Sequence, residues 1–173
     1  MEDLRRVTGQ TLNWIQPKLS RREYELKLDD RVFGTFNWGK FFGSVSSAST
    51  AAGDWDLVKT GFLHPIVTVR DRNTLADLAV LQQPWTGAGS VAFSSGTKYD
   101  WKGEGFIPSK WSFIDYKGQE AITFKSNNMS FKLSVEVVPK TDDKEIALLA
   151  VLGLLNVIRT RDAASSGAIA AMP

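Results

Sequence analysis

Apolar and polar residues alternate with a period of two along most of the chain. Tyr24, Leu26 and Leu28 alternate with charged residues, which is the pattern of a strand buried on one face. Later stretches of this kind are separated by turn-forming residues, with no helical pattern between them. The predicted strands are 24–28, 32–38, 44–52, 55–62, 66–70, 75–81, 91–93, 98–101, 111–114, 121–125 and 131–138.

Strand signals that recur at such close spacing favour an all-β sandwich or barrel. Residues 22–138 have room for about ten to twelve strands if each strand and its turn take about ten residues. Residues 1–20 fit either a short helix or an edge segment, because Gly9 and Pro17 interrupt their apolar pattern. The stretch 44–52, SVSSASTAA, fits a linker or a strand of small side chains beside something bulky. The strand is favoured because no charge run or proline accompanies it.

One stretch near the C-terminus, 146–158, is apolar almost without interruption: IALLAVLGLLNVI. It predicts a helix that is apolar on all sides and is therefore buried in a membrane or in a protein core. Its 13 residues fall short of the roughly 20 that a spanning helix needs, and Glu145 and Arg159 flank it. A membrane tail anchor is the alternative, but residues 161–173 begin with charges and continue with small side chains. We therefore favour burial in a protein core and expect that the protein is not an integral membrane protein.

The predicted helix covers residues 142–160, with Asp142 as N-cap and Glu145 at capping-box spacing. Its central part is about 20 Å long, which matches the height of a six-residue strand. Within it, Gly153 is tolerable if a strand or a large aromatic side chain packs tightly there. Residues 161–173 are expected to form a flexible tail.

These elements together predict one mainly β domain over residues 1–173. Its fold class is a closed antiparallel β-barrel of about 12 strands over 22–138, wrapped around a buried hydrophobic C-terminal helix. With 43% hydrophobic and 23% charged residues, the composition resembles that of an average soluble domain. Six tryptophans and ten phenylalanines suit strands and a thick core.

The composition also narrows the chemistry. The chain has no cysteine, which excludes disulfides, thiolate metal sites and cysteine nucleophiles. A net charge of +2 is too small to indicate a nucleic-acid partner. No secretory signal pattern is visible in the first twenty residues, so a cytoplasmic location is expected.

No residue pattern indicates a catalytic or metal site. His64 is the chain's single histidine, and no ligands with zinc-type spacing accompany it. Asp54 and Asp56 would share one face of a strand, where such pairs are usually solvated. Gly87 and Gly89 precede a strand rather than a phosphate-binding helix. We expect no enzyme, no cofactor and no metal.

Basic residues give the one binding hypothesis. They occur in three places: a group near the start of the chain that includes Lys18, a pair in one turn, and a pair that flanks Trp101. If they converge on one face, they could bind an anionic head group or phosphate, although interspersed acidic residues also fit an ordinary solvated surface. The candidate ligand-binding residues are Arg21, Arg22, Arg70, Arg72, Lys98 and Lys102.

Several segments resemble the tubby C-terminal-like superfamily, which includes tubby proteins, phospholipid scramblases and LURP-one-related proteins. The resemblance covers about residues 20–160, and the chain looks most like the short bacterial members. It rests on Thr60-Gly61-Phe62 with Pro65, Val67–Asp71, Leu75-Ala76, Phe93–Trp101, Trp111–Gly118 and the apolar helix.

The resemblance implies a closed barrel of about twelve strands around a C-terminal helix. It also implies either phosphoinositide binding on the barrel exterior, as in tubby domains, or action at membranes, as in scramblases. The chain departs from the scramblase pattern because it has no cysteine cluster and no D-x-D-x-D-G calcium segment. No family site residue can be carried over. We expect a non-enzymatic protein at the membrane periphery that binds anionic phospholipid head groups or another phosphorylated ligand; the alternative is a protein–protein interaction or scaffold module.

Overall fold

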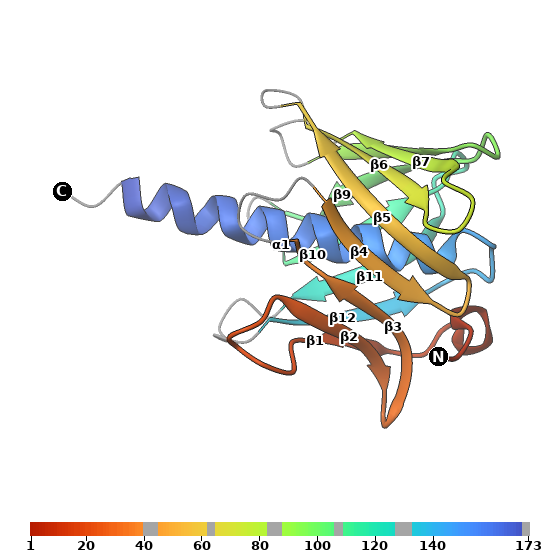
Figure 1. Cartoon of the computed structure of the whole chain (residues 1–173), viewed down its shortest axis with the longest axis horizontal. Helices are drawn as coiled ribbons and strands as arrows, with labels where there is room; N and C mark the ends of the chain where they lie inside the picture. The colour runs from red at the N-terminus through yellow and green to blue at the C-terminus, as the bar shows by residue number, and fades with distance from the viewer. Residues whose placement is uncertain (40–44, 62–64, 83–87, 106–108, 127–132, 171–173) are drawn as a thin grey trace.

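The computed structural model describes residues 1–39, 45–61, 65–82, 88–105, 109–126 and 133–170. They form a short 3-10 helix, twelve strands and one long α-helix (Figure 1). The helices are η1 (Leu4–Val7) and α1 (Ile146–Ala170). The strands are β1 (Leu12–Ile15), β2 (Glu23–Leu28), β3 (Arg31–Asn37), β4 (Val45–Thr50), β5 (Gly53–Thr60), β6 (Ile66–Asp71), β7 (Asp77–Gln82), β8 (Gly89–Phe93), β9 (Lys98–Gly103), β10 (Lys110–Ile114), β11 (Glu120–Ser126) and β12 (Ser134–Pro139).

The strands form one closed antiparallel barrel in which neighbours in sequence are neighbours in space. β1 closes the ring by pairing with β12, with Leu12 opposite Val137. The predicted closed barrel of about twelve strands is confirmed. Residues 1–20, whose structure the sequence left open, supply η1 and β1. β1 is not an edge strand, because a closed barrel has no edges.

The inward-facing residues follow the predicted period of two. Tyr24 and Leu26 on β2 are buried, and so are Val67 and Val69 on β6. Large aromatic side chains fill the wall between β9 and β11. Many of these rings are in contact, and the Trp101 and Trp111 rings stack with their centroids 6.4 Å apart.

Helix α1 runs through the barrel and projects from one end of it (Figure 1). We call the two openings the helix-start end and the helix-exit end. From Ile146 to Ile158 no side chain is more than 5% exposed, so the buried-core interpretation is confirmed. The helix packs most closely against β10–β12. Trp14 Nε1 donates a hydrogen bond to the Ala150 carbonyl, 3.2 Å away.

The bounds of α1 differ from the prediction at both ends. The Leu149 N–H donates to the Glu145 carbonyl, and the helix begins at Ile146, so Asp142 is not the N-cap. The helix continues to Ala170, so the predicted helix end at 160 is wrong and residues 161–170 are helical. No proline or glycine stops the helix near 160, and the next residues include several alanines, which favour a helix.

Strand bounds differ by a few residues. Leu75, predicted to begin a strand, lies instead in the β6–β7 turn with a φ of 60°, and β7 begins at Asp77. The Asp71 carboxylate fixes this turn by accepting hydrogen bonds from the N–H groups of Asn73 and Thr74, each at 2.8 Å. The same hydrogen bonds lower the pKa of Asp71.

Within the described parts of the chain, no helix is both long enough and apolar enough to cross a membrane.

Candidate functional site

The six residues predicted to bind an anion are divided between the two ends of the barrel. Because adjacent strands run in opposite directions, connections after odd-numbered strands leave at the helix-exit end, and those after even-numbered strands at the helix-start end. Toward the helix-exit end lie Arg21, Arg22 and Lys102. Toward the helix-start end lie Arg70, Arg72 and Lys98. The six residues therefore do not form one surface, although Arg22 and Arg72 border the same hollow on the outer wall.

At the helix-start side, the two arginines belong to a network of alternating charges on the outer wall. Arg70 Nε donates to Asp77 Oδ1 at 2.8 Å, and Arg72 Nε lies 3.1 Å from Asp56 Oδ1. Asp56 is also the register partner of Arg70 across β5 and β6. The bond to Asp77 and the negative charges nearby raise the pKa of Arg70. The arginines are thus balanced by carboxylates, and Asp56 has an ion-pair role here.

At the helix-exit end, Arg22 connects the barrel rim to the departing helix. Its Nη1 lies 3.1 Å from Asp162 Oδ2, and its guanidinium lies over the Trp38 ring at 5.7 Å. Beside it, burial raises the pKa of Tyr24. These contacts involve three separate elements, so Arg22 helps to hold α1 where it leaves the barrel.

Two adjoining hollows lie on the outer wall over β2–β5. Their volumes are about 390 and 530 Å³, and both are lined by Asn37 and Ser47. Lys18 borders the smaller hollow, and Arg22 and Arg72 border the larger one. Acidic residues line them as well: Glu23 and Glu25 the smaller hollow, and Asp56 the larger one.

The small residues of β4 form the floor of these hollows. The predicted strand over 44–52 is confirmed in its described part, Val45–Thr50, and Ser44 lies outside the described residues. Those small side chains were expected to make room for a bulky element such as the helix. Instead Ser47 and Ser49 line the outer hollows, while α1 packs most closely against β10–β12.

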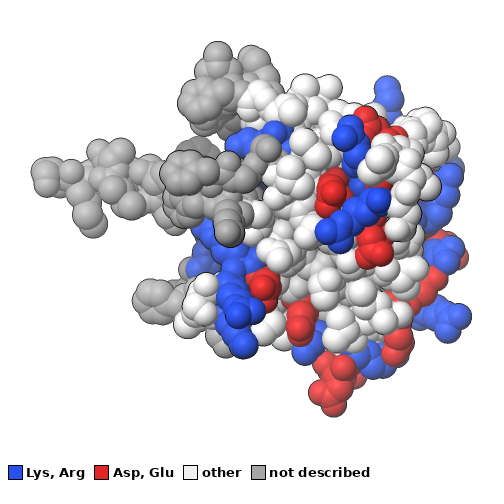
Figure 2. Space-filling view, in the orientation of Figure 1, with Lys and Arg blue, Asp and Glu red and all other residues white. Residues whose placement is uncertain are grey.

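The two halves of the barrel carry opposite net charge. With each strand divided at its midpoint, the helix-exit half holds nine described basic residues and five acidic ones. They are Lys18, Arg21, Arg22, Lys59, Lys102, Lys110, Lys125, Arg159 and Arg161, and Glu23, Glu25, Glu104, Glu136 and Asp162. The other half holds the remaining described charges, ten basic and fourteen acidic. In Figure 2, blue side chains gather near the root of the projecting helix, whereas blue and red mix on the opposite side.

Three of the nine exit-half basic residues belong to the sequence-based candidate set. Lys18 was grouped with Arg21 and Arg22 in the sequence, and the other five were missed because they are scattered along the chain. The alternating direction of the strands was the signal that could have found them, since it assigns each strand terminus to one end of the barrel.

The helix-start end holds a buried carboxylate. Glu145 is 8% exposed and accepts a hydrogen bond from Ser95 Oγ at 3.0 Å, beside a hollow of about 250 Å³ that Trp55 and Phe93 line. Tyr99 donates to Asp143 at 3.3 Å, and burial together with the nearby carboxylates raises the pKa of Tyr99. These bonds tie the β8–β9 hairpin to the start of α1.

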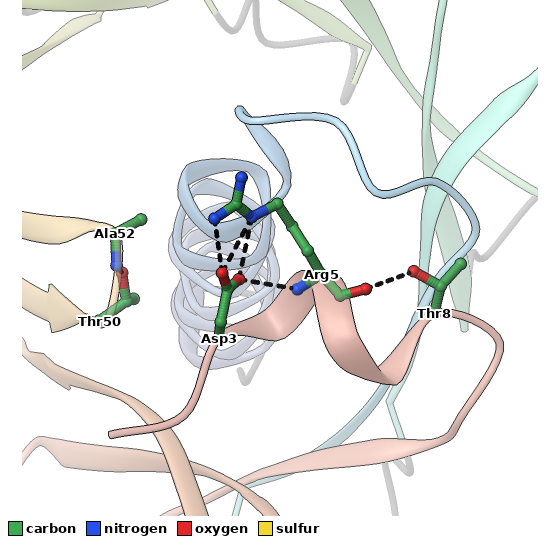
Figure 3. A network of polar contacts seen from close by, with 5 residues as sticks. All are labelled: Asp3, Arg5, Thr8, Thr50 and Ala52. Carbon is green, nitrogen blue, oxygen red and sulfur yellow. Dashed lines mark hydrogen bonds and ion pairs between the residues drawn. The ribbon is translucent and has the colours of Figure 1, made fainter.

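The first residues of the chain also lie at this end. Asp3 accepts hydrogen bonds from the Arg5 backbone and guanidinium (Figure 3), and the Arg5 side chain lowers the pKa of Asp3. The η1 helix that follows packs against both β12 and α1. The polar contacts at this end therefore hold the N-terminal segment and the start of α1 in place.

No group of three or more His, Cys, Asp or Glu residues that could hold a metal ion occurs among the residues described. His64 and Gly87, considered above as candidates, lie outside them. Comparison of the chain with protein-family profiles, with curated proteins and with solved structures gives no match. The basic helix-exit half is therefore the candidate site that the geometry itself offers.

Proposed function

We propose that the protein is a non-enzymatic, tubby-like barrel at the periphery of a cytoplasmic membrane surface, where its helix-exit end binds anionic lipid head groups or another phosphorylated ligand. The observation that carries this proposal is the division of charge between the two halves of the barrel. An anionic surface attracts the half with nine basic and five acidic residues and repels the other. Charge alone would thus orient the molecule with its projecting helix toward the ligand.

The expected strength follows from the size of the excess. Each Lys or Arg near an anionic membrane surface contributes about 1 kcal/mol, and the attraction falls off within a Debye length of about 8–10 Å. A surplus of four positive charges thus supports reversible, salt-sensitive binding rather than permanent anchoring.

Sedimentation with lipid vesicles tests this proposal. The protein should bind vesicles that contain phosphatidylserine or phosphoinositides and leave neutral phosphatidylcholine vesicles unbound. Replacing three exposed basic residues of the helix-exit end, Lys18→Gln, Arg21→Gln and Lys102→Gln, should weaken binding about tenfold or more.

The matched control makes the same change of charge at the other end. Lys98→Gln, Lys117→Gln and Lys140→Gln remove three exposed lysines of the helix-start half and should leave most of the binding intact. Equal effects of the two triple variants, or negligible binding to both kinds of vesicle, would contradict the proposal.

The outer hollows support the alternative function, a protein-interaction module. Ser47 lines both of them, and a tryptophan there would fill the space that a docked segment needs. Ser47→Trp should therefore leave vesicle binding unchanged if lipid recognition occurs at the helix-exit end. Loss of binding in that variant would move the site to the outer wall.

A further inference from the structure

Several buried polar atoms inside the helix-exit half have no hydrogen-bond partner among the described residues. They are Trp101 Nε1, Ser126 Oγ, Asn156 Nδ2 and Oδ1, and Arg159 Nη1. Asn156 is completely enclosed, with 0% of its surface exposed. Buried polar groups in folded proteins are nearly always paired with protein, water or a bound ion, so such a set calls for an occupant.

Contacts within the core bring the orphan groups of the strands close to α1. The Trp101 and Phe124 ring centroids are 5.4 Å apart, and the Phe124 ring lies directly against Gly153. Ser126 follows Phe124 by two residues on β11, which places it on the same inward face and nearer the helix-exit end.

The orphan groups of α1 continue from the same point. Asn156 and Arg159 lie one and two turns beyond Gly153 toward the helix-exit end, and the spacing of three keeps them on neighbouring parts of one helix face. The unpartnered groups of β9, β11 and α1 therefore lie at or beyond the contact of Phe124 with Gly153, in the helix-exit half of the barrel.

One of these groups carries an unbalanced charge. Arg159 is half-buried, with its Nη1 enclosed, and the loss of water around it lowers its pKa. A guanidinium still remains charged at neutral pH. The acidic residue three positions on, Asp162, pairs with Arg22. No acidic side chain in the described ranges is paired with Arg159, and a partly buried charge without a counter-charge is unfavourable.

We infer that Arg159, Asn156, Ser126 and Trp101 form an internal binding site for one phosphate group. The guanidinium, the Asn156 amide nitrogen and the indole N–H all donate, which suits the oxygens of an anion. Asn156 Oδ1 needs a donor in return, which the hydroxyl of a monoprotonated phosphate supplies and an ionised carboxylate lacks. Water could satisfy the hydrogen bonds but would leave the charge unbalanced. The site deepens the proposed function, on which it rests for its ligand class, and its phosphate could come from a free phosphate or from a phosphomonoester lipid.

Thermal unfolding of the full chain tests the site without a membrane. In inorganic phosphate, compared with chloride at equal ionic strength, the wild-type Tm should rise saturably, by about 5 °C at about a hundredfold excess over the Kd. Arg159→Met should raise the Tm in chloride, because it removes an unpaired, partly buried charge, and should abolish the rise in phosphate. Lys98→Gln, which removes an exposed charge at the other end, should keep that rise. If Arg159→Met does not fold, Asn156→Leu gives the second test, because it removes both amide atoms without changing the charge and should reduce the rise.

Vesicles separate the two sources of phosphate. If the ligand is a lipid, the wild type should prefer phosphatidic acid over phosphatidylserine at matched surface charge, and Arg159→Met should lose that preference while keeping its binding to phosphatidylserine. The site is overturned if phosphate and chloride give the same Tm and no lipid preference exists, or if both effects persist in Arg159→Met. Phosphatidylserine binding that survives this failure leaves the proposed function standing. A rise in Tm with phosphate but no binding to vesicles would support the internal site and contradict the proposed function at a membrane.

Discussion

Gly153 shows how one residue adapts α1 to the barrel. Glycine inside a helix costs roughly 1 kcal/mol relative to alanine, and the rest of the buried segment consists largely of good helix formers. The reason for the exception is Phe124, whose ring occupies the space where a Cβ would stand. The prediction from sequence that a strand or a large aromatic side chain packs there is confirmed, because Phe124 is an inward-facing residue of β11.

Gly153→Ala should therefore destabilise the protein although it improves helix propensity. Overpacking a filled core costs about 1–3 kcal/mol, which outweighs the gain of roughly 1 kcal/mol. Chemical denaturation of Gly153→Ala, Phe124→Leu and the double variant gives the coupling between the two sites. The smaller side chain at 124 should accommodate the new methyl group, so the double variant should be more stable than the two single losses imply, by about 1 kcal/mol. Strictly additive losses would show that Phe124 is not the obstacle.

At the scale of elements, the strands were predictable and the helix bounds were not. Strands with three alternating apolar residues, such as β2, follow directly from the period of two. β1 has only four residues beside a glycine and a proline, so no local pattern marks it, and its pairing with β12 defines it. The spacing of Asp142 and Glu145 fits a capping box, which led to the prediction of an N-cap at Asp142. The prediction was wrong, because the hydrogen bonds of the helix start at the Glu145 carbonyl. Between residue 160 and Gly167 the sequence holds no glycine or proline that would stop the helix.

The enclosed part of α1 should depend on the barrel for its stability, and the barrel on it. Leu152 is completely buried, so Leu152→Asp would place an unpaired charge inside the core and should prevent folding. Circular dichroism and thermal unfolding should show no cooperative transition for this variant. Leu152→Met, which keeps the volume, should lose less than about 1.5 kcal/mol. A soluble Leu152→Asp variant with a wild-type transition would contradict the enclosure of the helix.

At the scale of the whole molecule, the candidate site depends on which strand ends share an opening. Arg21 and Lys102 lie far apart in sequence, yet both lie near the helix-exit end because each lies close to a connection that follows an odd-numbered strand. The sequence could supply that grouping once strand number and direction were assigned. It could not supply the pairing of Arg70 and Arg72 with carboxylates, which depends on register. It also could not reveal the unpartnered polar atoms around Asn156, which depend on how the helix is rotated inside the barrel.

Closure of the ring and enclosure of the helix should be one cooperative event. β1 and β12 are the only paired strands in the described barrel that are far apart in sequence, and α1 follows β12 directly. Because the strand that closes the ring is followed at once by the helix, we expect closure and enclosure to occur together. Asn13 is central to this closure, because it lies opposite Glu136 on one side and Lys27 on the other.

Asn13→Pro should open the ring, because proline removes a ladder N–H and does not fit a strand that is paired on both sides. A loss of about 3 kcal/mol or more is expected, together with binding of a hydrophobic dye and a weakened near-ultraviolet circular dichroism signal as the apolar face of α1 becomes exposed. Asn13→Ala keeps the backbone N–H and should stay close to the wild type. Leu152→Asp should also expose the apolar surface of α1, in this case because the helix itself no longer packs in the barrel. Both variants should therefore bind the dye and show a weakened near-ultraviolet circular dichroism signal. A folded, dye-free Asn13→Pro variant would instead mean that β2–β12 hold the helix without β1, and that the barrel need not be closed to protect its core.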